Sequence, residues 1–258
     1  MIDKQSKTSN GQDKILTIIG PTGSGKTGLA IDVALELKRR GVFDGCEIIS
    51  ADSRAIYKGM DICTAKPSHD EMRGVPHWGI DLVGPDDRFT VADFKRYAEQ
   101  KISEIHNRGN FAIIAGGTGL YIDALIFNYS FSESAKKNYS DRNKMCEQYL
   151  VIGIDWPREE LRKRLYKRSE QLFAQPIEEE YERVAKVYPA DSQAMKSDIY
   201  PIVGAMMRGE LSRQEAIEKN ALVDWHLAKR QLTWFKRNPE IVWLPLDEAR
   251  DYILNTYS

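Results

Sequence analysis

The chain has 258 residues, of which 42% are hydrophobic and 29% charged, and its net charge at pH 7 is -1. This composition excludes a disordered, a collagen-like or a membrane-embedded protein. It also excludes a globally basic surface, so any nucleic-acid partner needs a local basic patch. The polar start lacks an apolar signal segment, and three cysteines lie far apart. We therefore expect a protein of the reducing cytoplasm, with no membrane partner.

Short apolar runs alternate with helix-length segments along the chain. Residues 1–13 are polar and are expected to form a flexible tail. Runs rich in Ile, Val and Leu are typical of strands that are buried on both faces of a parallel sheet. They predict strands over 15–19, 47–50, 111–115, 149–154 and 241–244. The longer segments between them predict helices over 26–40, 91–107, 119–127, 158–173 and roughly 213–237.

This alternation predicts an α/β fold in which helices cover both faces of a parallel sheet. We expect one domain over 14–258. The stretch 128–148 is the least apolar interior segment and is expected to be an exposed connection. Residues 158–237 are nearly all helical in pattern, so they predict a helical elaboration of the C-terminal half that could act as a lid.

The sequence Gly-Pro-Thr-Gly-Ser-Gly-Lys-Thr at 20–27 is the most specific single motif. It fits the P-loop pattern and lies between an apolar strand and a helix, so the sheet is expected to be of the P-loop NTPase type. Glycines let backbone N–H groups converge on phosphate oxygens, and a helix N-terminus favours negative charge. Lys26 would reach the phosphate, and the Thr27 hydroxyl would ligate Mg²⁺. The expected diphosphate-binding residues are Gly20, Thr22, Gly23, Ser24, Gly25, Lys26 and Thr27.

Two further groups are expected to face this phosphate site. Asp52 follows the second predicted strand, and Thr118 lies in the Gly-Gly-Thr-Gly turn after the third. The carboxyl ends of parallel strands form the ligand cleft of α/β folds. From the residues alone, Asp52 could instead cap a helix or sit in the second shell of Mg²⁺, and Thr118 could simply cap the next helix.

Several motifs together resemble the tRNA dimethylallyltransferases, also called tRNA isopentenyltransferases. They are GPTGSGKT at 20–27, ADSRAIYKGMDICTAKP at 51–67, VPHWGID at 75–81, TVADFKRYA at 90–98, GGTGLYIDAL at 116–125 and AKRQLTWFKRN at 228–238. These motifs span most of the chain, and their combination is far more specific than the P-loop alone. The resemblance implies transfer of a dimethylallyl group from dimethylallyl diphosphate to N6 of the adenosine 3′ of the tRNA anticodon.

The resemblance also implies roles for individual residues. Asp52 would be the general base for the adenine amine, and Thr118 would position the base or a phosphate oxygen. The P-loop, with Mg²⁺, would hold the diphosphate leaving group rather than ATP. The expected contacts to tRNA are made by Asp52, Ser53, Arg54, Ala55, Thr118, Arg142, Lys229 and Arg230. We expect the chain to act as a monomer.

Two sets of residues keep two interpretations each. The basic stretches 158–168 and 229–237 suit RNA contact, whereas the glutamates interspersed in the first also suit a solvated helix face. The allyl group could pack against Ile56, Tyr57, Leu120 and Tyr121, or these four could be ordinary core residues.

The chain departs from the family pattern in several places, and the family's Arg-Ala-Leu-Glu segment is not recognisable in it. Relatives carry a helical insertion of several dozen residues after GGTGLY, and here the short segment 128–148 replaces it. Asp224-Trp225 stands where the family has Thr-Arg, so an arginine expected to contact the pyrophosphate is missing. Cys63 stands in a glycine position. These departures predict weaker tRNA binding than in longer relatives.

Three other functions stay open on the sequence. Enzymes that prenylate free AMP or ADP also lack the insertion. A P-loop small-molecule kinase would use a basic lid helix and Asp52 equally well. A catalytically weakened RNA-binding module would keep the fold without the reaction. The motif at 228–238 favours the tRNA-modifying branch.

Overall fold

The structure is a computed structural model that describes residues 14–131, 144–189, 192, 195–196 and 199–258. The expected tail at 1–13 and the part of the connector that holds Arg142 lie outside the described residues. Within them, six strands form one parallel sheet in the order β3-β2-β4-β1-β5-β6. The strands are β1 (Ile15–Ile19), β2 (Cys46–Ala51), β3 (His77–Trp78), β4 (Phe111–Gly116), β5 (Tyr149–Ile154) and β6 (Val242–Leu244).

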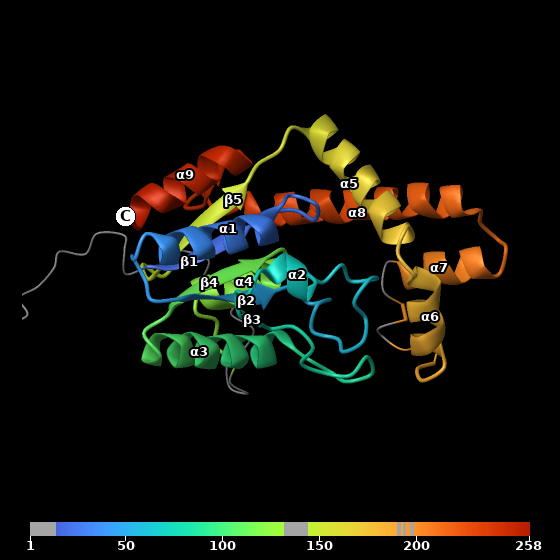
Figure 1. Ribbon diagram of the computed structural model, residues 1–258, viewed down its shortest axis with the longest axis horizontal. Coiled ribbons are helices and arrows are strands. Elements are labelled where there is room, and N and C mark those ends of the chain that lie inside the picture. Colours follow the sequence, from blue (N-terminus) through green and yellow to red (C-terminus); the bar gives the residue numbers. More distant parts are fainter. Residues whose placement is uncertain (1–13, 132–143, 190–191, 193–194, 197–198) are drawn as a thin grey trace, which may run out of the picture.

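Helices cover both faces of this sheet (Figure 1), as the sequence predicts. α1 and α9 pack on one face, and α3 and α4 on the other. Because successive side chains of a strand point to opposite faces, Leu16 and Ile18 of β1 enter the first layer, and Ile15 and Ile19 the second. The helices are α1 (Lys26–Arg39), α2 (His69–Met72), α3 (Val91–Asn107), α4 (Gly119–Ile126), α5 (Arg158–Phe173), α6 (Ile177–Ala185), α7 (Tyr200–Met207), α8 (Arg213–Phe235) and α9 (Leu246–Thr256).

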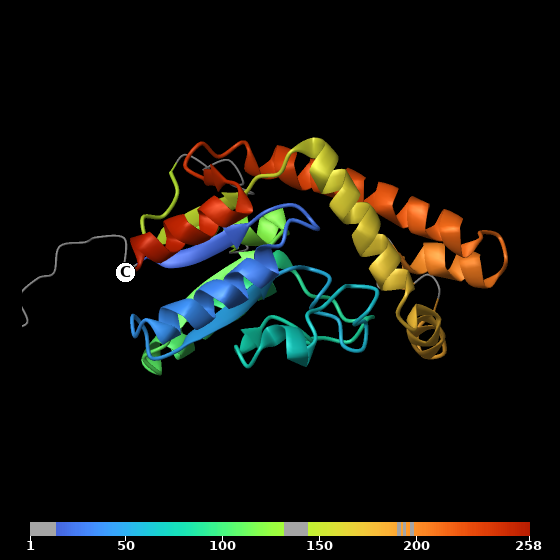
Figure 2. The same ribbon diagram turned by 45° about the horizontal axis from the view of Figure 1, so that its top comes forward.

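Helices α5 to α8 form a helical arm that runs beyond one end of the sheet (Figures 1 and 2), so the predicted C-terminal elaboration is confirmed. In the arm, α5 packs on α8, and α7 packs on α6 and α8. A separate apolar cluster joins the arm to the body, because Ile56, Tyr57 and Met60 pack against arm residues such as Phe173 and Tyr200. The segment that follows β2 is therefore one of the places where the arm meets the body.

Three elements of the structure are not predicted from the sequence: β3, α2 and α9. β3 has two residues between Pro76 and Gly79, which is too short for a periodic pattern. α2 is a single turn whose N-terminus is capped by a capping box between Ser68 and Glu71. α9 buries Ala249, Ile253 and Leu254 on the α1 side of the sheet. No helix in the described residues is long and apolar enough to cross a membrane.

Candidate active site

A cavity of about 930 Å³ lies at the carboxyl ends of the central strands, between the sheet and the helical arm. Its lining comes from segments far apart in the sequence: the P-loop, residues 52–55, 63–67 and 116–120, and parts of α5 and α8. The cleft expected at the strand ends is therefore present, and the arm forms its second side.

The P-loop bends through two glycines before α1 begins. Gly23 and Gly25 have φ angles of 73° and 88°, which side chains other than glycine rarely tolerate. Of the predicted phosphate residues, the structure places Thr22, Gly23, Gly25, Lys26 and Thr27 on the cavity. It does not place Gly20 or Ser24 there; both are buried, and the Ser24 hydroxyl has no hydrogen-bond partner among the described residues.

Lys26 is the lysine of this loop, and its environment lowers the pKa of its ammonium group. Its Nζ donates to the carbonyl of Pro21 at 3.3 Å. Burial lowers the pKa of Lys26 to about 8, while the nearby carboxylate of Asp52 opposes that shift. An anion bound in the cavity would favour the ammonium form in the same way. The loop is therefore set to bind a negatively charged group.

Two arginines of the arm reach the P-loop. Arg164 Nε donates to the carbonyl of Gly23 at 3.0 Å. Arg168 Nη1 donates to Thr22 Oγ1 at 2.5 Å and to Asp224 Oδ2 at 3.2 Å. From the sequence alone, this basic stretch suits either RNA contact or a solvated helix face, and neither interpretation predicts that the two arginines contact the P-loop. Their spacing of four residues on one helix face is the signal that could have found it.

Two other arginines of α5 lie away from the P-loop, together with Lys229 of α8. Arg158, Arg162 and Lys229 lie over the ring of Trp225, at 5.7, 5.5 and 5.7 Å from its centroid. Trp225 is buried between α5 and α8. The tryptophan that replaces the expected arginine therefore packs in the arm, while Asp224 beside it faces the cavity.

Asp52 and Thr118 lie together on the sheet side of the cavity. Thr118 Oγ1 accepts the N–H of Ser53 at 2.9 Å and donates to Ser53 Oγ at 3.2 Å. Thr118 occupies the N-cap position of α4 but makes no side-chain cap bond. Asp52 Oδ1 accepts the N–H of Arg54 at 2.9 Å, and turns rather than a helix follow it. Neither side chain serves as a helix cap.

Gln231 of α8 connects the two loops, and sequence reasoning missed it. Its Oε1 accepts the N–H of Thr22 at 2.7 Å, and its Nε2 donates to the carbonyl of Gly117 at 3.0 Å. A Cβ atom on Gly117 would lie 2.5 Å from Gln231 Nε2, and one on Gly119 would lie 2.3 Å from Trp234. The glycines of this turn therefore allow α8 to approach. Gln231 belongs to the motif at 228–238, whose presence was the available signal.

The predicted tRNA residues divide between two places. Ser53, Arg54, Ala55 and Arg230 line the main cavity. Lys229 does not; it lines a second, more open hollow of about 660 Å³. This hollow is formed by His226, Lys229, Arg230, Thr233, Trp234 and Arg237, and it shares Arg230 and Trp234 with the main cavity.

The four apolar candidates also divide. Leu120 lines the cavity, whereas Ile56, Tyr57 and Tyr121 are buried in the core. Tyr121 stacks on Phe94 with ring centroids 4.1 Å apart. For these three, core packing is the better interpretation.

Cys63 fits its glycine position without strain, because it is not among the described residues with positive φ. Burial raises the pKa of its thiol. The departure at this position therefore needs no left-handed backbone, and the thiol stays protonated.

The sequence model of the IPP transferases matches residues 55–147 and 129–238. A tRNA dimethylallyltransferase of Acetivibrio thermocellus is 34% identical over 297 aligned positions, which cover 92% of this chain and 93% of the relative. The chain belongs to the IPP transferase family. The alignment has 297 positions, whereas this IPP transferase has 258 residues. The relative therefore contains residues that have no counterpart in this chain. The two family matches overlap within 128–148, where the shortened insertion remains a prediction.

Solved structures agree with this membership. The tRNA isopentenylpyrophosphate transferase of Bacillus halodurans superposes with a TM-score of 0.79 at 28% identity, covering 95% of this chain and 97% of that one. The corresponding Staphylococcus epidermidis enzyme gives a TM-score of 0.79 at 32% identity, with coverage of 94% and 98%. The fold of this IPP transferase is therefore that of its family.

Proposed function

We propose that this IPP transferase transfers a dimethylallyl group from dimethylallyl diphosphate to N6 of the adenosine 3′ of the tRNA anticodon. The observation that carries the proposal is that one cavity brings together Lys26 of the P-loop with Asp52 and Thr118 from two other strand ends. A relative 34% identical to the chain is named a tRNA dimethylallyltransferase. The same cavity therefore offers a diphosphate site and a base for the acceptor.

The phosphate side stabilises the leaving group. As the bond between the allyl C1 and the diphosphate oxygen breaks, both electrons go to the diphosphate, and its negative charge grows. Lys26, Arg164 and Arg168 lie on this side of the cavity. Fixed cations and backbone N–H groups stabilise such developing charge without reorganising.

The acceptor side removes a proton. The N6 amine attacks C1, the C–N bond forms, and the proton lost from N6 passes to the carboxylate of Asp52. Asp52 is held by the backbone N–H of Arg54. Thr118 fixes Ser53, the next residue of the same loop. These bonds hold the carboxylate ready for proton transfer.

The donor set fits Mg²⁺ held mainly by the substrate. No group of three or more His, Cys, Asp or Glu side chains forms a metal site among the residues that the structure describes. Mg²⁺ usually takes one or two protein ligands together with substrate phosphates and water. We propose the Thr27 hydroxyl on the cavity as a ligand. When bound, the ion would neutralise charge on the diphosphate.

The tRNA is proposed to extend from the cavity along α8. The second hollow carries Lys229, Arg230 and Arg237, and none of the described residues that line it is acidic. The guanidinium of Arg237 lies over the Trp234 ring there, at 5.6 Å from the ring centroid. Cations interleaved with aromatic rings suit an RNA backbone with unstacked bases. This continuity favours RNA over a free nucleotide as acceptor.

We also propose that the enzyme acts as a monomer in the cytoplasm. Every group of the proposed mechanism comes from one chain, so the site needs no second copy. Light scattering of the purified protein at working concentration checks the oligomeric state; a stable dimer would contradict it.

The decisive experiment supplies labelled dimethylallyl diphosphate with three acceptors in parallel: an anticodon stem-loop, AMP, and ATP plus small-molecule acceptors. We expect the label to enter the stem-loop and ATP to remain intact. Labelling of AMP at least as well as the RNA would support the free-nucleotide alternative. ATP turnover would support a kinase, and RNA binding without transfer would support a weakened binding module.

A salt series tests the RNA surface separately. Each neutralised phosphate contributes about one unit to the slope of log K against log salt. Arg230→Glu and Arg237→Glu should each weaken stem-loop binding and flatten that slope by about one unit. Lys219→Glu, an exposed charge reversal nearer the start of α8, is the matched control. Equal slopes in all variants would remove α8 from the RNA surface.

A further inference from the structure

Residues 57–67, here called the wall loop, have no role in the mechanism so far. The loop contains Lys66 and Pro67 and supplies 63–67 to the cavity lining, next to the segment 52–55 that carries Asp52. It consists of turns and one isolated bridge rather than a helix or a strand. Something other than a regular backbone ladder must therefore fix its shape.

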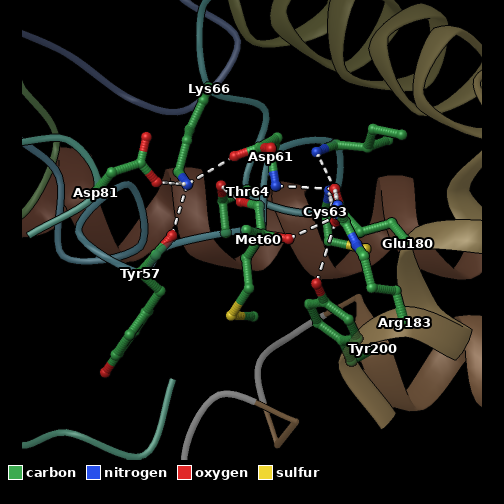
Figure 3. Close-up of polar contacts among 12 residues, drawn as sticks. Tyr57, Met60, Asp61, Cys63, Thr64, Lys66, Asp81, Glu180, Arg183 and Tyr200 are labelled. Atoms are coloured by element: carbon green, nitrogen blue, oxygen red, sulfur yellow. Dashed lines mark hydrogen bonds and ion pairs between the residues drawn. The ribbon is translucent and has the colours of Figure 1, made fainter. Parts of the chain in front are cut away.

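A buried glutamate of the arm binds the centre of the wall loop (Figure 3). Glu180 of α6 is 3% exposed. Its Oε2 accepts the N–H groups of Asp61 at 2.8 Å and Ile62 at 2.7 Å, and its Oε1 accepts that of Cys63 at 2.9 Å. Oε1 also accepts the Tyr200 hydroxyl at 3.1 Å. One carboxylate from the arm therefore takes three consecutive backbone donors of the loop.

The negative charge of Glu180 is what suits this position. Consecutive backbone N–H groups make an anion site, and bonds to a carboxylate are stronger than neutral ones. A glutamine would present an NH₂ group to at least one of these donors, because only its carbonyl end accepts. Burial raises the pKa of the Tyr200 hydroxyl, with Glu180 nearby adding to the effect, so Tyr200 remains a donor.

The other end of the loop is closed by Lys66. Its Nζ donates to the carbonyl of Tyr57 at 2.5 Å, to Asp61 Oδ1 at 2.8 Å and to Asp81 Oδ1 at 2.5 Å (Figure 3). An ammonium has three N–H donors, and all three have acceptors here. Lys66 therefore holds the loop and the segment before α3 together. Two side chains of α6 hydrogen-bond the loop to the arm: Arg183, which donates to the carbonyl of Gly59 at 2.9 Å, and Glu180, which accepts the N–H groups at the loop's centre.

We propose that Glu180 is a positioning residue for the acceptor side of the reaction: through the N–H groups of 61–63, it sets the wall that places the acceptor nucleotide beside Asp52. The proposal rests on the proposed function, since it concerns the acceptor of that reaction. It requires that loss of the charge affects the acceptor step and spares the diphosphate site, which is built from other segments.

The test compares Glu180→Gln with Glu179→Gln, the same change at the exposed neighbouring position. For Glu180→Gln, we expect kcat/KM for a stem-loop to fall about 10- to 100-fold, as for other displaced groups around a reacting centre. Affinity for inorganic pyrophosphate should stay within about twofold. Amide hydrogen exchange of a peptide over 60–67 should become faster. Glu179→Gln should match the wild type in all three measurements.

Two further variants keep the test decisive. Tyr200→Phe retains the carboxylate and should lose less activity than Glu180→Gln. If Glu180→Gln does not fold, Glu180→Asp keeps the charge but draws it back by one methylene, and it should show the same selective loss.

Equal losses of pyrophosphate affinity and stem-loop turnover would overturn the proposal, because they indicate general structural support. Unchanged exchange at 60–67 would also overturn it. Failure of the proposed function has a different signature: the wild type would not prenylate RNA, while the exchange comparison would still show whether Glu180 holds the loop.

Discussion

The cavity has a phosphate wall, formed by the P-loop with Arg164 and Arg168 of α5, and an acceptor wall, formed by residues 52–55, 63–67 and 116–120. The two walls use charged side chains in opposite ways. On the phosphate wall, Arg164 and Arg168 each hydrogen-bond to the described part of the chain through one nitrogen, and a guanidinium has five N–H donors. On the acceptor wall, Lys66 uses all three of its donors within the protein. Glu180 likewise has its carboxylate occupied by the wall loop. A cationic side chain that lines a cavity is therefore a ligand-binding group only where its partners in the protein leave some of its N–H donors unused.

The walls also differ in how they are built. The phosphate wall is centred on one local motif, whereas the acceptor wall is assembled by contacts between distant segments. Gln231 bonds to both the P-loop and the Gly-Gly-Thr-Gly turn. Because Gln231 joins the two walls, we expect separate effects only from substitutions at other residues, and the following substitutions test that separation.

The largest effect is expected from Asp52→Asn on the acceptor wall. Loss of a general base costs about 10²–10⁴ in rate, so single-turnover prenylation should slow by that amount while pyrophosphate affinity changes little. Asp70→Asn, an exposed change on α2, is the control. An unchanged single-turnover rate would remove Asp52 from the reaction.

Lys26→Ala on the phosphate wall should have the opposite profile. A hydrogen bond to a charged group is worth about 1.5–3 kcal/mol, so pyrophosphate affinity should fall by about 10- to 10²-fold. Isothermal titration with pyrophosphate measures it. Stem-loop affinity in the absence of diphosphate should remain close to that of the wild type. Comparable loss of both affinities would mean that the two walls do not act separately.

The pH dependence sharpens the role of Lys26. Its pKa in the free protein is lowered to about 8 from 10.5, and a bound diphosphate should raise it again. Affinity should therefore be full below pH 8 and fall as pH rises above it, by about tenfold at pH 9. Lys26→Arg, which stays charged, should bind more weakly but lose this dependence. Identical profiles for the two proteins would assign the effect to the ionisation of the ligand.

The smallest effect is expected at Asp224, an acidic side chain in an otherwise cationic wall. It pairs with Arg168 at 3.2 Å and adds negative charge where a diphosphate is expected. Asp224→Asn should tighten pyrophosphate binding by about fivefold, which corresponds to about 1 kcal/mol. Asp251→Asn on the exposed face of α9 is the control. Weaker binding would mean that Asp224 chiefly holds Arg168 in place.

Much of the fold and half of the site could be predicted from the sequence. Strands β1, β4 and β5 are continuous apolar runs, because both faces of a parallel sheet are buried. The P-loop is a local motif whose glycines and lysine lie within eight residues. Asp52 and Thr118 follow from one topological fact: parallel strands end at the same edge of the sheet. Each of these signals is local or fixed by simple geometry.

The tertiary structure alone decided how the basic residues and carboxylates are used. The charges of α5 look alike in the sequence, yet Arg164 and Arg168 contact the P-loop while Arg158 and Arg162 surround Trp225. Glu180 is one of three successive glutamates in α6, and only its position under the wall loop distinguishes it. The contacts of Glu180, Arg164 and Arg168 join residues more than a hundred positions apart. Local pattern carries no record of such pairing, because it depends on where the arm packs against the body.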